Sequence, residues 1–236
     1  MAYQSCFMRY ELKYLLTRPQ KEALLKVMEP YMKLDQYGRT IIRNIYYDTP
    51  NFRLIRRSIE RPLYKEKLRL RSYKQIESEQ DVFVELKRKF KKVVYKRRLA
   101  MPFREAADWL RGENLKKPPG QIGDELQCFR SFYGELIPTV FLSYEREAFY
   151  ALDGSDFRVT MDENILARDH DLSLCSRPYG TALLPESMTL LELKAPGALP
   201  LWITKFLTEN RIYKVSFSKY GTAYQKLLFK GGVFCV

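Results

Sequence analysis

The sequence has little of the side-chain chemistry on which zinc sites and disulfide frameworks depend. Its 236 residues include one histidine and four cysteines. Cys6, Cys128, Cys175 and Cys235 are widely separated and form no Cys-x-x-Cys pair, and His170 has no cysteine near it. These spacings argue against a zinc site. They favour reduced thiols, as in a cytosolic protein, over a set of disulfides.

Long apolar runs and a glycine-rich phosphate loop are also missing. No stretch approaches the roughly 20 apolar residues of a membrane span, and Arg9, Glu11 and Lys13 interrupt the region where a signal peptide would be apolar. Nothing matches the G-x-x-x-x-G-K-[ST] loop, so side chains would have to hold the phosphates of a nucleotide. We expect a cytoplasmic protein that does not itself span a membrane. Association with the inner face of a membrane through a membrane protein partner stays open.

What the chain does contain is a large core and an excess of positive charge. Hydrophobic residues make up 46% and aromatic residues 14%, which predicts a globular protein. We expect one domain over residues 1–236, since barrels of this length commonly remain undivided. Lys and Arg number 41 against 28 Asp and Glu, a formal charge of +13, which predicts an anionic partner.

Short runs with period-two alternation predict eight β-strands, enough to close a small barrel. They cover residues 7–15, 40–47, 64–73, 81–90, 93–101, 139–150, 157–162 and 189–194. Three helices are predicted: one from a capping box at Thr17 and Gln20 to Pro30, one from a box at Asp124 and Gln127, and one over residues 220–228. The predicted fold class is α+β: a closed antiparallel eight-stranded β-barrel with helices packed on its outside.

One strand decides which face of the barrel is charged. Lys67, Arg69 and Arg71 share one side of a strand and have no carboxylate in the same run. Alternation alone does not distinguish an inner face from a solvated outer one. Like charges repel, however, so an anion is needed to offset this run, and we predict that it faces inward. Leu68 and Leu70 would then face outward, beneath the helices.

Other strands repeat the pattern of charged residues on one face. These residues are Arg9, Glu11, Lys13, Glu85, Lys87, Lys89, Lys96, Arg98, Arg158, Asp162, Glu192 and Lys194. A linear polyphosphate would match cations on several walls. The carboxylates Glu11, Glu85, Asp162 and Glu192 offer hard ligands for a divalent metal, or pair with neighbouring cations.

Nucleic acid is the other anion that this charge suggests. We predict no nucleic-acid partner, because the cations follow strand alternation and no aromatic RNA-reading motif accompanies them. Arg88, Lys91, Lys92 and Arg97 are expected on the outside, facing an acidic partner or an anionic membrane surface.

Taken in order, several segments resemble a known family. They are RYELKYLL, RNIYYDTPNF, KLRLRSY, VFVELKRK, YKRR, LSYEREAFY, FRVTMDENI, LLELK and SFSKYG. Their order and spacing resemble the polyphosphate polymerase domain of the vacuolar transporter chaperone (VTC) complex and its bacterial relatives. That domain belongs to the triphosphate tunnel metalloenzyme superfamily, so the resemblance implies a tunnel fold, a divalent metal (Mn²⁺ or Mg²⁺), and ATP and inorganic polyphosphate as partners.

The resemblance implies roles for individual residues. Arg69, Arg71, Lys87, Arg146 and Glu192 are expected to be catalytic, with Glu192 holding the metal and Glu11 and Asp162 as weaker metal candidates. The expected phosphate-binding residues are Lys13, Lys67, Arg69, Arg71, Lys87, Lys96, Arg98, Arg146, Lys194, Lys214 and Lys219. Ser216 stands where the family has a second lysine, and Lys214 is the candidate substitute.

One departure concerns the reaction. Hydrolytic relatives begin with E-x-E-x-K, whereas the first of those positions is Arg9 here. This favours an ATP-dependent polyphosphate polymerase that transfers the γ-phosphoryl group of ATP to a growing chain and releases ADP. The alternatives are a metal-dependent tripolyphosphatase or nucleoside triphosphatase of the same fold, and a non-catalytic polyphosphate-binding subunit.

Overall fold

The computed structural model describes residues 6–77, 79–91, 93–113 and 116–229, with the backbone alone for residues 6–9. In this part of the chain ten strands form one antiparallel sheet. They are β1 (Cys6–Thr17), β2 (Met32–Leu34), β3 (Thr40–Asp48), β4 (Tyr64–Ser72), β5 (Asp81–Phe90), β6 (Val93–Pro102), β7 (Ile137–Ala151), β8 (Arg158–Arg168), β9 (Thr181–Ala182) and β10 (Met188–Ala195). The eight predicted strands are confirmed; β2 and β9 were not predicted.

The strand pairings place eight strands around a common interior. The order is β2-β7-β3-β4-β5-β6-β1-β10-β8-β9, and β7 also pairs with β8. Strand β1 lies between β6 and β10 and pairs with both. Residues 6–9 pair with β6, and residues 10–17 pair with β10. The antiparallel sheet with helices on its outside is therefore confirmed. A barrel closed along its whole length stays a prediction.

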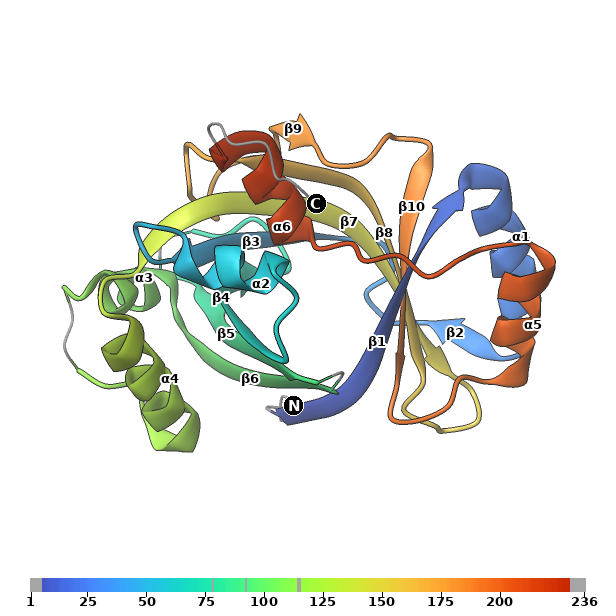
Figure 1. The fold of residues 1–236 in the computed structure, drawn as a ribbon, viewed down its shortest axis with the longest axis horizontal. Helices are drawn as coiled ribbons and strands as arrows, with labels where there is room; N and C mark the ends of the chain where they lie inside the picture. The colour runs from blue at the N-terminus through green and yellow to red at the C-terminus, as the bar shows by residue number, and fades with distance from the viewer. Residues whose placement is uncertain (1–5, 78, 92, 114–115, 230–236) are drawn as a thin grey trace.

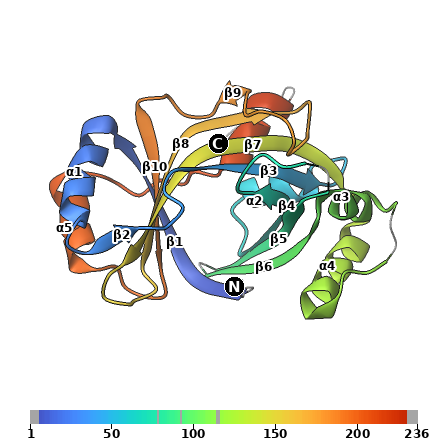
Figure 2. The same ribbon diagram turned by 180° about the vertical axis from the view of Figure 1, so that it is seen from behind.

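Six α-helices and one π-helical turn complete the described fold. They are α1 (Arg18–Met28), α2 (Arg53–Ile59), α3 (Phe103–Arg111), α4 (Gly120–Tyr133), α5 (Leu201–Glu209), α6 (Lys219–Ala223) and the π-helical turn η1 (Tyr224–Leu228). In Figure 1, α3 and α4 lie at one end of the molecule and α1 and α5 at the other, while α2 and α6 lie side by side between them. Figure 2 shows the same arrangement from behind.

Local sequence explains where two of these helices begin. The capping box of α1 is confirmed, because the Thr17 backbone N–H donates to the Gln20 side chain over 2.9 Å. The box predicted at Asp124 is wrong: α4 begins at Gly120, four residues earlier, directly after Pro119. A Cβ at Gly123 would lie 1.9 Å from the Pro118 carbonyl oxygen. The missing side chain thus allows the helix to start against the two prolines.

Apolar side chains of the sheet lie under the helices, as predicted. Leu68 and Leu70 are buried in a cluster with Trp109 of α3 and Phe129 of α4. Leu191 and Leu193 lie in a second cluster with residues of α1 and α5, and a third cluster lies between the sheet and α6. Each fully buried leucine contributes roughly 1.5–3 kcal/mol. Because this burial fixes the outer face of each strand, the alternate residues point to the interior.

Helices α2, α3 and α5 were not predicted from the sequence. The predicted third helix also differs, because α6 ends at Ala223 and continues as the π-helical turn. Within the described residues, no helix is long and apolar enough to cross a membrane.

Candidate functional site

A cavity of about 540 Å³ opens in the interior of the sheet. Two carboxylates, Glu11 and Glu192, line it. Its thirteen cationic lining residues are Lys13, Arg61, Lys65, Lys67, Arg69, Arg71, Lys87, Lys89, Lys96, Arg146, Lys194, Lys214 and Lys219. This lining gives the cavity a large excess of positive charge, which would attract an anion.

Most of the predicted phosphate-binding residues meet in this cavity. Arg98 is the exception: it does not line the cavity, and its guanidinium lies 4.5 Å from the centre of the Phe83 ring. The sequence analysis missed Arg61, Lys65 and Lys89 as site residues. Alternation along β4 and β5 places Lys65 on the face of Lys67 and Lys89 on the face of Lys87, so a signal existed for these two. Arg61 lies before β4 with a φ of 56°, and no pattern pointed to it.

One group of cations surrounds Glu85 on β5, whose side chain is fully buried. Arg69 donates to Oε2 from Nε and Nη2, over 2.9 and 2.7 Å. Lys96 lies 2.6 Å from Oε1 and Arg98 2.7 Å from it, while Arg71 lies 3.7 Å from Oε2. Burial opposes ionisation of Glu85, but these cations outweigh it and hold its pKa well below the usual range.

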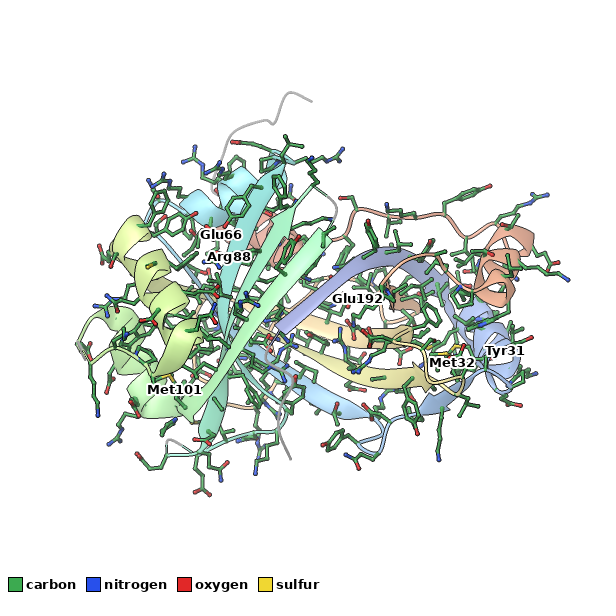
Figure 3. The ribbon with its side chains drawn as sticks, turned by 90° about the horizontal axis from the view of Figure 1, so that it is seen from below. Tyr31, Met32, Glu66, Arg88, Met101 and Glu192 are labelled. Atoms are coloured by element: carbon green, nitrogen blue, oxygen red, sulfur yellow. The ribbon has the colours of Figure 1, made fainter. Side chains whose placement is uncertain are left out.

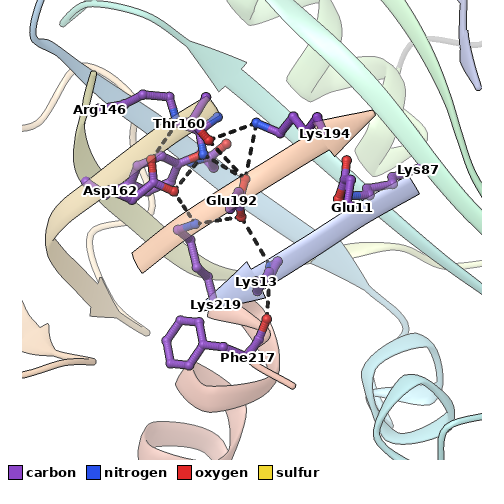
Figure 4. A network of polar contacts seen from close by, with 12 residues as sticks. Glu11, Lys13, Lys87, Arg146, Thr160, Asp162, Glu192, Lys194, Phe217 and Lys219 are labelled. Carbon is purple, nitrogen blue, oxygen red and sulfur yellow. Dashed lines mark hydrogen bonds and ion pairs between the residues drawn. The ribbon is translucent and has the colours of Figure 1, made fainter. Parts of the chain in front are cut away.

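A second group of cations surrounds Glu192 on β10 (Figure 4). Its Oε1 lies 3.2 Å from Lys13 and 3.3 Å from Lys219, and its Oε2 lies 3.2 Å from Arg146 and 3.3 Å from Lys194. Burial is again the largest influence and opposes ionisation. The four cations nevertheless hold the pKa of Glu192 well below its usual range. Burial also lowers the pKa of Lys194, with repulsion from Arg146, to about 7.

Asp162 on β8 pairs with cations of the group around Glu192 and does not line the cavity. Arg146 donates to both of its carboxylate oxygens, over 2.5 and 2.6 Å, and Lys219 contacts it as well. Asp162 is fully buried and is not among the lining residues. These contacts do not support the metal role suggested for Asp162; its place in the structure is to orient Arg146 and Lys219.

A third group of cations has no such compensation. Lys65 lies directly opposite Lys89, and Lys67 directly opposite Lys87, across the β4–β5 pair. Like charges opposite one another destabilise a sheet. Glu11 neutralises Lys87 over 2.5 Å, but among the described residues neither Lys65, Lys67 nor Lys89 forms an ion pair with a carboxylate. A bound anion would offset this charge.

The pKa values of Lys65, Lys67 and Lys89 are all lower than that of an ordinary lysine. For Lys67, burial first and then repulsion from Lys13 and Lys87 hold the pKa well below its usual range. Burial, followed by neighbouring cations, also lowers the pKa values of Lys65 and Lys89.

Two carboxylates face the cavity as possible metal ligands, Glu11 on β1 and Glu192 on β10. Within the described residues no three His, Cys, Asp or Glu side chains gather to hold a metal. Mg²⁺-like ions usually take one or two protein carboxylates and complete their shell with water and substrate phosphates. The donor set therefore fits a metal held between Glu192, Glu11 and a bound phosphate chain. It does not fit an all-protein cage.

The predicted outer patch lies away from the cavity. Arg88 pairs with Glu66 over 3.0 Å and with Glu125 of α4 over 2.6 Å, and Arg97 pairs with Glu125 over 2.9 Å. Figure 3 shows Glu66 and Arg88 together, apart from Glu192. Lys91 is exposed, and Lys92 lies outside the described residues. The side chains of Arg9, Cys6 and Cys235 also lie outside them; Cys128 and Cys175 are free thiols, and Cys128 is exposed.

Comparisons with known proteins agree with this arrangement. The model of the VTC domain family matches residues 8–228. A candidate adenylate cyclase from Bacillus halodurans superposes with a TM-score of 0.56 at 16% identity, covering 91% of this chain and 96% of that one. A candidate adenylyl cyclase from Hippeastrum, described as having a dominant triphosphatase activity, gives a TM-score of 0.54 at 14% identity, covering 94% and 97%. No curated protein matches the chain. The structural neighbours have the triphosphate tunnel fold.

Proposed function

The chain belongs to the VTC domain family, and from this premise we propose that it is a polyphosphate polymerase. It transfers the γ-phosphoryl group of ATP to the end of an inorganic polyphosphate chain and releases ADP. The family and the tunnel fold support an enzyme of phosphate chemistry. The observation that carries the proposal is the cavity lining: thirteen cations against two carboxylates, with like charges opposed at Lys65–Lys89 and Lys67–Lys87.

Phosphoryl transfer asks a protein mainly for alignment and charge stabilisation. Arg69, Arg71 and Lys87 align the triphosphate in our proposal, and Arg146 stabilises the charge that develops on the transferred group. The planar, bidentate guanidinium of Arg69 is already oriented by Glu85, so little reorganisation is needed when the ligand binds. The remaining cations of the predicted set that line the cavity neutralise the chain: Lys13, Lys67, Lys96, Lys194, Lys214 and Lys219.

Glu192 and Glu11 would hold the divalent metal, Mn²⁺ or Mg²⁺. A bound metal would supply positive charge that helps to neutralise the phosphate chain. No general base is required for chain growth, because a terminal phosphate is already an anionic nucleophile. The further parts of the proposal are a tunnel closed along its length, a single domain over residues 1–236, and a cytoplasmic location. Contact with a membrane through a partner protein is left open, and nucleic acid is not proposed as a partner.

The test is to mix the pure protein with ATP and Mn²⁺ and to separate the products. Long polyphosphate with stoichiometric ADP supports the polymerase. Arg69→Ala should abolish synthesis, whereas Lys205→Ala removes an exposed cation on α5 outside the cavity and should leave synthesis unchanged. Stoichiometric free phosphate without polymer would contradict the polymerase.

Hydrolysis of tripolyphosphate or a nucleoside triphosphate is the second candidate function. It is favoured by the triphosphatase activity stated for the Hippeastrum protein, a fold neighbour at 14% identity. In this reaction water, in place of the chain end, would accept the phosphoryl group. Binding of polyphosphate without turnover of ATP would instead identify an accessory subunit.

A further inference from the structure

A serine hydroxyl lies in the cavity against one of the unpaired lysines. Ser218 precedes α6 and lines the cavity, and its Oγ lies 2.7 Å from Nζ of Lys67 on β4. The backbone N–H of Gly221 donates to the same Oγ over 3.0 Å. A Cβ at Gly221 would lie 3.1 Å from this oxygen, so the glycine keeps the space beside the hydroxyl open.

Lys67 is suited to accept a proton from this hydroxyl. Its Nζ faces Ser218 and its neighbours are cations, namely Lys13, Lys65, Lys87 and Arg69. Among the described residues no carboxylate pairs with it, and its pKa lies well below the usual range because of burial and this repulsion. In a Ser-Lys pair the lysine can take the hydroxyl proton when its amine is unprotonated, and the lowered pKa of Lys67 favours that form.

One other serine and one threonine near the cavity lack this combination. Ser216 lines the cavity two residues earlier, but the described structure gives it no hydrogen bond to a lysine. Thr160 accepts a hydrogen bond from Lys194, yet that lysine also pairs with Glu192, and Thr160 does not line the cavity. Of these three residues, Ser218 both lines the cavity and contacts a lysine that has no carboxylate partner among the described residues.

We propose that Ser218 is a self-phosphorylation site and the first acceptor for chain growth. The proposal rests on the proposed function, since it needs a triphosphate in the cavity. Ser218 Oγ attacks the γ-phosphorus of ATP; the Oγ–P bond forms, and the bond from phosphorus to the β,γ-bridging oxygen breaks. The hydroxyl proton passes to Nζ of Lys67, and the electron pair leaves with ADP.

The product fits the charges around it. A phosphoserine brings nearly two negative charges and three strong acceptor oxygens. It would lie beside the Lys67 ammonium that the transfer creates, with Lys13, Lys65 and Lys87 close by. The modification thus supplies the anion that the lysines of β4 and β5 lack.

The first experiment measures phosphate bound to the protein. The full chain is incubated with γ-labelled ATP and Mn²⁺ without an added acceptor, then denatured and analysed by intact and tandem mass spectrometry. We expect label bound to Ser218, either as one phosphoryl group or as the phosphate chain grown from it. Ser218→Asn keeps a side-chain oxygen for the Gly221 N–H but has no hydroxyl, and should carry no label. Ser216→Ala is the matched control and should be labelled as the wild type is.

The second experiment measures chain growth with and without an added acceptor. Without one, Ser218→Asn should start chains about tenfold or more slowly than the wild type, because it has lost an acceptor held beside the triphosphate. Added tripolyphosphate should restore its rate. Unchanged unprimed synthesis by Ser218→Asn would overturn the proposal.

The two readouts separate this proposal from the proposed function. Polymer made by a wild type that carries no phosphoserine overturns the role of Ser218 alone. Label that persists in Ser218→Asn also overturns it. Phosphoserine at Ser218 without any polymer supports the modification and overturns the polymerase. Neither label nor polymer overturns both.

Discussion

The paired strands β4 and β5 form one wall of the cavity, and the two ends of this wall differ in whether their cations have a carboxylate partner. At one end Arg69 lies directly opposite Glu85, and the carboxylate collects four cations. At the other end Lys65 lies opposite Lys89, with no carboxylate paired to either among the described residues. We call these the paired end and the lysine end. The paired end is complete without a ligand, whereas the lysine end is completed only by an anion.

This difference separates stability from binding. Removing one partner of a buried ion pair is strongly destabilising, because the other charge stays buried and unpaired. Removing a cation from a cluster of like charges relieves repulsion instead. Loss of the shared carboxylate at the paired end should therefore act mainly on folding, and loss of a cation at the lysine end mainly on the affinity for phosphate chains.

The largest effect is expected for Glu85→Gln at the paired end. Loss of the carboxylate leaves Arg69, Arg71, Lys96 and Arg98 without their shared partner, which should lower the free energy of unfolding by about 3–5 kcal/mol. Urea unfolding measures it. Tripolyphosphate should restore part of the loss by taking the place of the carboxylate. The control Glu186→Gln changes an exposed residue and should stay within about 0.5 kcal/mol. An unchanged unfolding midpoint for Glu85→Gln would contradict the comparison.

Lys67→Met tests the lysine end. The substitution removes a charge and keeps an unbranched side chain, so the free energy of unfolding should not fall. Loss of one charge-assisted hydrogen bond, worth about 1.5–3 kcal/mol, should weaken tripolyphosphate binding roughly tenfold to a hundredfold. Isothermal titration calorimetry measures the affinity, with Lys205→Met as the control. A variant that is destabilised but binds normally would reverse the roles of the two ends.

The pH dependence of stability should differ from that of binding. The pKa of Lys194 is about 7 in the fold, well below the ordinary lysine value, so above pH 7 the unfolded chain holds a proton that the folded chain has lost. The free energy of unfolding should therefore rise between pH 7 and 9, on the order of 1–2 kcal/mol. Lys194→Met should flatten the rise. Tripolyphosphate affinity should fall over the same range, as the lysines lose charge; parallel pH profiles of stability and affinity would contradict this.

The smallest effect is expected for Lys89→Glu. It converts the Lys65–Lys89 pair into opposite charges across the β4–β5 pair, which should stabilise the protein by roughly 0.2–1 kcal/mol while weakening tripolyphosphate binding. Thermal unfolding and calorimetry measure the two effects. Lys91→Glu reverses an exposed charge nearby and controls for net charge. A loss of stability in Lys89→Glu but not in Lys91→Glu would show that the lysine end is already compensated.

Much of the fold could be predicted, because a strand with one buried face has apolar residues at every second position. All eight predicted strands are present, and Leu68 and Leu70 lie under helices as expected; Leu191 and Leu193 are buried in the same way. Helices α2, α3 and α5 were missed because they are short, at seven to nine residues. Periodicity is weak over two turns.

The candidate site was predictable in its residue types but not in its pairings. Alternation placed Arg69 and Arg71 on one face of their strand, and the absence of a carboxylate in that run predicted that this face points inward. It gave no sign that Glu85 would be shared among four cations, since those cations come from β4 and β6 on either side of it. The contact between Ser218 and Lys67 was equally out of reach, because nothing local relates the segment before α6 to β4.

The sequence by itself determined which side chains share a face of each strand, because each strand sends alternate residues to opposite faces and only one face was apolar. Tertiary structure decided how the interior charges are shared. Strand register set Arg69 against Glu85 but Lys65 against Lys89, and the return of the chain near its C-terminus brought Ser218 to Lys67. Register and chain return depend on the packing of distant segments, which no local pattern records.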